Sequence, residues 1–422
     1  FVAARVMVLG AALGPPPSLV ENPLVVVHGV ARWVEGLRVV GLAMGLVAGI
    51  VAPRPDWGLG AFPVASGPAW PAIAAVGLLA LIAVASWAAR RQRTPAAAAA
   101  ALALGPLLLF GQPWIDLPTA TADRLWPLLV AAASLGLALL AQQVSDALVV
   151  GAPRAGRAGA AAAFGVCSAA MVLIVVWFTT VPQRLAAWRD DDALFTEALR
   201  ASPASYRALV NRAGVDVRAG DPHAAIARLQ RAVALAPEAP FGHLALGRAA
   251  VAAGDAALAA RAIAGLDVAA GHDGPDAAEL RCAVAVRFGA ADAVDRCRRA
   301  VRAGTSPRPL TWMWLAMALD GSGQSDPALR AFDQALVAAT PAPADPLIVR
   351  NRGVFLARRG DFPGALAALV VAVDAGDHAA RGPLEAVMAR LDASGDAAQR
   401  ARIQRLRARL AASNSGHDDG AP

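Results

Sequence analysis

Glycine recurs at an almost constant interval in the second half of the chain. The glycines are Gly220, Gly254, Gly289, Gly323, Gly360 and Gly395, so that successive gaps are 34, 35, 34, 37 and 35 residues. Aspartate follows four of them, at Asp221, Asp255, Asp361 and Asp396. A period of about 34 residues is typical of stacked helical hairpins, each of which buries its apolar face against the next. This half is therefore predicted to be an all-α solenoid.

The first half has a different character, because the chain is almost continuously apolar as far as Pro182. Hydrophobic residues make up 57% of the whole chain, more than one soluble core requires. Apolar runs long enough to span a bilayer occur at 34–52, 71–89, 95–111, 125–145 and 158–181, with a cut helix expected at 1–12. We therefore predict a polytopic transmembrane helical domain over 1–181, a seam with a leading helix over 182–205, the solenoid over 206–412 and a disordered tail over 413–422.

Arginines in short loops predict the orientation of these spans. The loop between the second and third runs carries Arg90, Arg91 and Arg93, and the loop between the fourth and fifth runs carries Arg154 and Arg157. Cytoplasmic loops are enriched in basic residues. The loops 53–70 and 112–124, and all of the chain after Val181, are then expected on the outer side, which in a bacterium is the periplasm. The predicted location is the bacterial inner membrane, with the repeats in the periplasm.

Small and large residues recur at fixed offsets within each repeat. With each glycine at position 15 of a 34-residue unit, the unit that begins at Tyr206 places Ala213, Ala225, Leu229, Ala232 and Pro237 where a tetratricopeptide repeat has small, small, large, small and Pro. The unit that begins at Pro309 follows the same pattern, whereas the unit around Gly289 is degenerate. We predict about five units, preceded by a leading helix at Asp192–Ala201 and closed by an arginine-rich helix at Ala397–Ala411.

The first helix of each unit is expected to line the inner face of such a stack. The candidate residues for a peptide-binding groove there are Arg207, Asn211, Arg218, Arg248, Arg350, Asn351 and Arg358. Asn211 and Asn351 occupy the sixth position of their units, where an amide can bond an extended peptide backbone. The alternative is that these side chains are solvated or bond within their own helices.

Two cysteines fall on the two helices of the degenerate hairpin. Cys282 and Cys297 have offsets that face each other across its core. In a periplasmic domain they could form a disulfide, and otherwise they would be two buried free thiols. The three cysteines and six histidines of the chain show no metal-binding spacing, and no cofactor is expected.

The order of motifs along the chain resembles the transmembrane and tetratricopeptide-repeat O-mannosyltransferase-like proteins of the membrane glycosyltransferase C superfamily. The residues that carry the resemblance are Asn22-Pro23-Leu24, Arg32-Trp33, Pro53-Arg54-Pro55-Asp56-Trp57, Ala122-Asp123-Arg124-Leu125-Trp126-Pro127 and Trp188-Arg189-Asp190 ahead of Leu194-Phe195. The stretch Ala122–Pro127 is similar to the family element A-E-R-x-x-Y-x-P, with Asp for Glu, Trp for Tyr and the Pro shifted by one position. The seam Trp188–Asn211 is similar to the family junction between membrane domain and repeats.

This resemblance implies transfer of a sugar from a lipid-phosphate donor to a protein acceptor that the repeats bind. Such chemistry requires a carboxylate to take the proton of the acceptor hydroxyl and a cation to hold the leaving phosphate. Asp56 and Asp123 are the candidates for supporting the site, and Arg124 for a phosphate contact. The family's principal acid lies nearer the N-terminus, in a part expected to be missing because the chain begins at Phe1 without Met.

Two other classes of function fit the same pattern. One is a non-catalytic membrane-anchored scaffold that uses its repeats for protein–protein interaction, and the other is a protein resembling an O-antigen ligase or polymerase. The predicted partners are membrane lipid and a protein or peptide. The net charge of +7 does not predict nucleic-acid binding, because the basic residues are spread over the chain and are not interleaved with aromatic residues on one surface.

Overall fold

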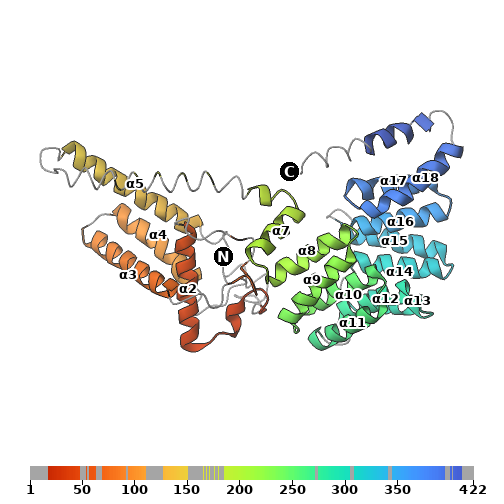
Figure 1. Cartoon of the computed structure of the whole chain (residues 1–422), viewed down its shortest axis with the longest axis horizontal. Coiled ribbons are helices and arrows are strands. Elements are labelled where there is room, and N and C mark those ends of the chain that lie inside the picture. The colour runs from red at the N-terminus through yellow and green to blue at the C-terminus, as the bar shows by residue number, and fades with distance from the viewer. Residues whose placement is uncertain are drawn as a thin grey trace. The chain divides into compact units, whose positions relative to one another are not determined.

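The computed structural model describes residues 18–47, 54, 57–62, 69–91, 94–110, 127–150, 165, 168, 171, 175, 179, 185–270, 274–304, 308–340, 345–394, 400–401 and 403–410. Every regular element within these residues is helical (Figure 1). The chain divides into two compact units, Phe1–Arg212 and Ala213–Pro422. The predicted all-α class is therefore confirmed for the described residues.

The first unit contains a helical bundle formed from the apolar half of the sequence. A short 3-10 helix, η1 (Pro23–Val26), precedes α2 (Gly29–Val47), α3 (Ala69–Arg90), α4 (Thr94–Phe110) and α5 (Pro127–Val150). Helix α2 packs against α3, α4 and α5. Their shared core includes Val39, Leu42, Leu107 and Leu129, all of which are buried.

Four of the five predicted apolar runs are helices in this bundle, and the fifth, 158–181, lies almost entirely outside the described residues. Within the described parts of the chain, no helix combines the length and the apolar character needed to cross a bilayer. The prediction of helical segments is thus confirmed for these runs, but the prediction that they span a membrane gains no support.

Three segments that are far apart in the sequence meet in the first unit through backbone hydrogen bonds. The amide of Leu59 donates to the carbonyl of Val20 at 3.1 Å, and the amide of Tyr206 donates to the carbonyl of Leu59 at 3.0 Å. Arg54 adds hydrogen bonds from Nη1 to the carbonyl of Ala61 at 3.1 Å and to Oγ of Ser202 at 3.2 Å. We call this set, residues 20–24, 54, 57–62 and 202–206, the seam cluster.

The seam cluster joins several of the motifs on which the family resemblance depends. Asn22 is fully buried, and its side chain accepts a hydrogen bond from the amide of Leu24 at 3.0 Å. The guanidinium of Arg54 lies 5.3 Å from the ring centroid of the buried Trp57. The motifs around Asn22, Arg54 and Ser205 therefore have a shared structural role, which is to hold the turn from which α8 begins.

The leading helix is present as α7 (Asp191–Ala201), within one residue of its predicted start. The side chain of Asp190 accepts a hydrogen bond from the amide of Ala193 at 2.8 Å and so caps the helix. This backbone hydrogen bond, followed by that from the Arg189 side chain, lowers the pKa of Asp190. The aspartate of the motif Trp188-Arg189-Asp190 thus begins the helix that leads to the repeats.

The repeats form helical hairpins with the predicted spacing (Figure 1). The pairs are α8 (Tyr206–Arg218) with α9 (Pro222–Leu235), α10 (Pro240–Ala253) with α11 (Ala256–Ala270), α12 (Pro275–Arg287) with α13 (Ala293–Arg302), α14 (Pro309–Gly321) with α15 (Ser325–Ala339), and α16 (Pro346–Arg358) with α17 (Phe362–Asp374). A 3-10 helix, η3 (His378–Ala380), and α18 (Arg381–Ser394) follow. Residues 403–410, within the predicted closing helix, are also helical.

The recurring Gly-Asp pair ends one helix and begins the next. The glycines Gly220, Gly254, Gly289, Gly323 and Gly360 have positive φ angles of 71° to 86°, the left-handed conformation that terminates a helix. Asp221, Asp255 and Asp361 then cap the second helix by accepting hydrogen bonds from the amides of Ala224, Leu258 and Gly364. The turns at Gly220, Gly254 and Gly360 are therefore each encoded by two adjacent residues.

Gly60 is required in the seam cluster for a steric reason, and this generates a test. Its φ is +77°, and a Cβ added there would lie 1.8 Å from the carbonyl oxygen of Ala204. Gly60→Ala should destabilise the contact by about 2–4 kcal/mol through backbone strain and overpacking. The amide of Tyr206 should then exchange with deuterium faster than in the wild type.

Gly29→Ala is the matched control, because Gly29 also has a positive φ of 62° but no atom within 4 Å of an added Cβ. It should cost only the strain of the left-handed conformation, about 1 kcal/mol, and leave exchange at Tyr206 unchanged. Equal exchange at Tyr206 in the two variants would contradict the steric role of Gly60.

Candidate functional site

The first helices of successive hairpins form a continuous surface in the second unit. Helix α10 packs against α12, α12 against α14, and α14 against α16. Among the described residues, no two successive second helices pack to a comparable extent. Because the first helices are drawn together on one side, the stack curves toward them. We call the surface formed by α10, α12, α14 and α16 the inner face.

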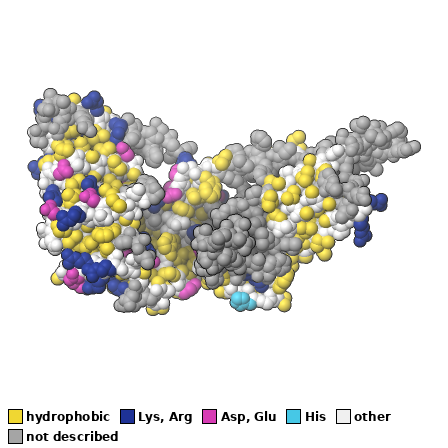
Figure 2. Space-filling model, turned by 180° about the vertical axis from the view of Figure 1, so that it is seen from behind, with side chains coloured by type: hydrophobic (Ala, Val, Ile, Leu, Met, Phe, Trp, Pro, Cys, Tyr) yellow, Lys and Arg dark blue, Asp and Glu magenta, His cyan; other side chains and the backbone are white. Residues whose placement is uncertain are grey.

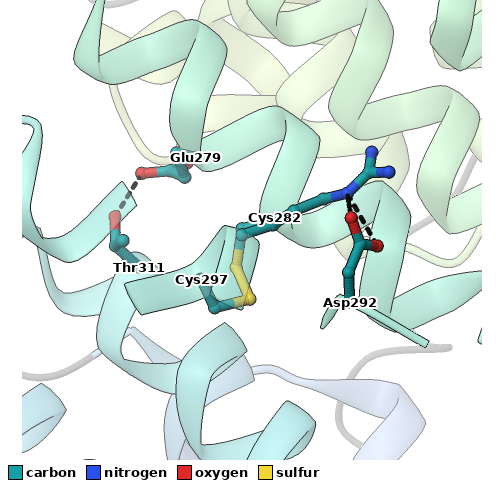
Figure 3. Close-up of a disulfide and its surroundings, with 6 residues drawn as sticks. Glu279, Cys282, Asp292, Cys297 and Thr311 are labelled. Carbon is teal, nitrogen blue, oxygen red and sulfur yellow. Dashed lines mark hydrogen bonds and ion pairs between the residues drawn. A yellow bond between two sulfur atoms is a disulfide. The ribbon is translucent and has the colours of Figure 1, made fainter. Parts of the chain in front are cut away.

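A buried carboxylate connects three of these helices. Glu279 on α12 has a side chain that is 3% exposed, and it forms an ion pair with Arg248 on α10. Its second oxygen accepts a hydrogen bond from Oγ1 of Thr311 on α14 at 3.0 Å (Figure 3). The half-buried Arg248 therefore has a partner in the neighbouring repeat, and its charge is largely neutralised within the protein.

Two further predicted groove arginines are paired in the same way. Arg350 donates from Nη1 to Asp377 at 3.0 Å, and the exposed Arg358 on α16 donates from Nη2 to Asp320 on α14 at 2.5 Å. Asn351 donates from Nδ2 to the carbonyl of Leu347 in its own helix at 2.8 Å and lies 3.5 Å from the sulfur of Met313. These contacts stabilise the stack, and the predicted role of these residues in peptide binding stays a prediction.

The other predicted site residues lie on α8 or outside the described residues. Arg207 is exposed and Asn211 half-buried on the part of α8 that belongs to the first unit, whereas Arg218 is exposed in the last turn of the same helix. Asp56, Asp123 and Arg124 lie outside the described residues. The predicted catalytic role of these three residues therefore stays a prediction from the sequence.

Sequence reasoning missed the acids that pair with the groove arginines. Glu279 and Asp320 belong to no motif, and Glu279 lies in the degenerate unit, whereas Asp377 follows Gly376 in a Gly-Asp pair outside the regular series. A usable signal was present, because Arg248 and Glu279 occupy ninth and fifth positions of adjacent first helices, 31 residues apart. Within the described residues, no group of three or more His, Cys, Asp or Glu residues is placed to hold a metal ion.

The degenerate hairpin is closed by a disulfide. Cys282 on α12 and Cys297 on α13 are bonded, with their Cα atoms 4.6 Å apart, and both are fully buried (Figure 3). Of the two alternatives that the sequence left open, the structure has the bridged one. At the start of α13, a hydrogen bond from Arg296 lowers the pKa of Asp292 and holds its carboxylate ionised.

Comparison with protein-family models finds no match for this chain, and comparison with curated proteins finds none. Solved structures similar to it include the tetratricopeptide-repeat protein TTC0263 from Thermus thermophilus, which is 17% identical, with a TM-score of 0.37 over 43% of this chain and 98% of that one. YrrB, described as a tetratricopeptide-repeat protein with an unusual peptide-binding site, is 22% identical, with a TM-score of 0.25. The match covers 44% of this chain and 94% of YrrB. The tetratricopeptide-repeat domain of P58(IPK) is 14% identical, with a TM-score of 0.25, and the match covers 76% of this chain and 99% of that domain.

The assignment of the repeats to the tetratricopeptide class rests on the hairpins themselves. Their helix bounds, the glycine at each turn and the small residues between the helices all follow that pattern. The resemblance of the whole chain to O-mannosyltransferase-like proteins stays a prediction from the sequence.

The disulfide can be tested by counting free thiols. The chain has three cysteines, so alkylation of the denatured, non-reduced protein should add at most one label, at Cys167. A double Cys282→Ala/Cys297→Ala variant should unfold in the α12–α13 region with a free energy of unfolding lower by about 3 kcal/mol, the value expected for a closed loop of this length. Three labels on protein prepared without reductant would contradict the bridge.

Proposed function

We propose that the repeats are a protein-binding module and that the inner face is its binding surface. The observation that carries this proposal is the continuous packing of four first helices into one surface with partly exposed side chains. Such a surface can hold an extended segment of a partner across several repeats. Phe241, near the start of α10 and 56% exposed, provides an aromatic contact at one end of it.

Site-specific photo-crosslinking in the native host tests this proposal. A benzoyl-phenylalanine at Phe241 on the inner face should crosslink the full chain to another polypeptide. The same probe at Val268, which is 89% exposed on the second helix α11, is the control and should give no comparable product. Equal crosslinking at both positions, or none at Phe241, would contradict the proposal.

We also propose that the first unit is associated with a membrane, as the sequence predicted. The supporting observation is the set of exposed apolar side chains on several sides of α3, namely Ile73, Val76, Leu79, Ile82, Val84 and Trp87. Figure 2 shows hydrophobic side chains over much of the visible face of the α2–α5 bundle, at the right of the view, whereas charged side chains are interspersed over the repeats. Large exposed apolar surfaces mark interaction sites for protein or membrane.

Flotation of the full chain with phosphatidylcholine–phosphatidylglycerol vesicles tests this association. Leu79→Glu/Ile82→Glu should reduce the vesicle-bound fraction about tenfold or more, because ionised side chains are costly to place in hydrocarbon. Val268→Glu on α11 should leave binding unchanged. A wild-type chain that does not float, or a double variant that floats as well as the wild type, would rule out lipid contact through α3.

A periplasmic location of the repeats is a further part of the proposal. Disulfides persist in oxidising compartments such as the bacterial periplasm and are rare in the cytosol, so the bridge between Cys282 and Cys297 supports export. Sugar transfer from a lipid-phosphate donor stays a prediction from the sequence resemblance, because Asp56, Asp123 and Arg124 carry it and lie outside the described residues.

A further inference from the structure

The inner face carries an apolar stripe on α14 that continues onto α16. Leu310, Trp314 and Met317 are spaced by four and three residues and therefore lie along one side of α14. Each of the three packs in part against the core of the repeats and is in part exposed, whereas Met313, Leu315, Ala316 and Leu319 of the same helix are buried.

Helix α16 carries apolar side chains at the same repeat positions as α14. Leu347 and Val354 occupy the second and ninth positions of their unit, as Leu310 and Met317 do in theirs, and both are partly exposed. Asn351 lies between them and reaches the sulfur of Met313 on α14 at 3.5 Å. The two helices pack directly against each other. We call Leu310, Trp314, Met317, Leu347 and Val354 the apolar stripe.

The charged groups beside the apolar stripe are already paired with one another. Arg358 bonds Asp320, whose side chain is 18% exposed, and Arg350 bonds Asp377, whose side chain is 10% exposed. The Arg350 side chain is itself only 21% exposed, so an acidic partner would have to compete with Asp377 for it. A basic partner would likewise have to compete with the arginines for either carboxylate. In either case a charge of the protein would be left without its partner, which is costly when it is desolvated. Arg358, 63% exposed, is the member of these pairs that a partner can reach without breaking one.

We infer that the apolar stripe binds an uncharged segment of a partner protein that carries aromatic or aliphatic side chains. This inference rests on the proposed function of the inner face and specifies the chemistry of its ligand. Such a segment covers Trp314 and Met317 without disturbing the Arg358–Asp320 and Arg350–Asp377 pairs. Tryptophan and methionine suit this role, because a large aromatic surface anchors a contact and a flexible thioether adapts to it.

A selection experiment identifies the ligand chemistry directly. A random peptide library displayed on phage is selected on the immobilised full chain, and the affinities of the enriched peptides are then measured as synthetic peptides. The enriched sequences should be uncharged and rich in aromatic and aliphatic residues. Enrichment of acidic peptides whose binding is lost in Arg350→Ala or Arg358→Ala would overturn the inference.

Two substitutions on the same hairpin provide the matched comparison. Met317→Glu places a charge in the apolar stripe and should weaken the selected peptides at least about tenfold, which corresponds to 1.4 kcal/mol. Val337→Glu places the same charge on α15, where the side chain is 65% exposed, and should change affinity less than about twofold. Equal effects of the two substitutions would overturn the inference.

Leu310→Glu is a second variant in case Met317→Glu does not fold. It lies in the first turn of α14, where an acidic residue is compatible with the helix dipole, and it should weaken binding to a similar extent. If no peptide is enriched while the probe at Phe241 still crosslinks a polypeptide, the inference about ligand chemistry fails and the proposed function stands. If both experiments are negative, both fail.

Discussion

Close approach between neighbouring helices is the constraint on which the repeat stack depends. A Cβ added at Gly247 on α10 would lie 2.3 Å from a methyl carbon of Leu280 on α12, and one added at Gly353 on α16 would lie 2.8 Å from Cγ of Leu369 on α17. Small residues at these positions let a large residue of the next helix fill the space. The contact at Gly247 therefore limits the distance between two hairpins, and the contact at Gly353 limits the distance within one hairpin.

Ion pairs add a second level of connection between the repeats. The buried Glu279 bonds Arg248 and Thr311, and thus links three successive first helices, while Arg358 and Asp320 link two. Pairing of this kind compensates the desolvation of each carboxylate, and it also decides what the inner face presents to a ligand. A face rich in arginine in the sequence is, over α14 and α16, a face of paired charges and partly exposed apolar side chains.

Local features of the structure were predictable from the sequence, and contacts between distant residues were not. The hairpins, the leading helix and the turns at the repeat glycines from Gly220 to Gly360 follow from spacing and capping, which involve neighbours in the chain. The last glycine of the series, Gly395, lies outside the described residues. The contact of Leu59 with Tyr206 joins residues that no local pattern relates, and the pair of Arg248 with Glu279 is related only through the positions of the two residues in adjacent repeats. The disulfide was partly predictable, because the offsets of the two cysteines within one hairpin made a bridge possible without requiring it.

The candidate catalytic residues were proposed from the sequence and have no position in the described structure. The aspartates Asp56 and Asp123 were selected for their predicted side of a membrane, and they lie outside the described residues. The motif around Asp56 did prove informative in another way. Arg54 bonds Ser202 in the turn before α8 and lies over the ring of the buried Trp57, so these two residues have a structural role in the seam cluster.

The position of the disulfide within the stack has a consequence for how the solenoid unfolds. In a linear array each repeat is stabilised only by its neighbours, so a weak unit in the middle divides the array into two parts that melt independently. The hairpin α12–α13 is the one whose sequence departs furthest from the repeat pattern, and its second helix is only 10 residues long. A covalent link inside this hairpin keeps the weakest unit ordered, so that the repeats on either side of it can behave as one cooperative structure.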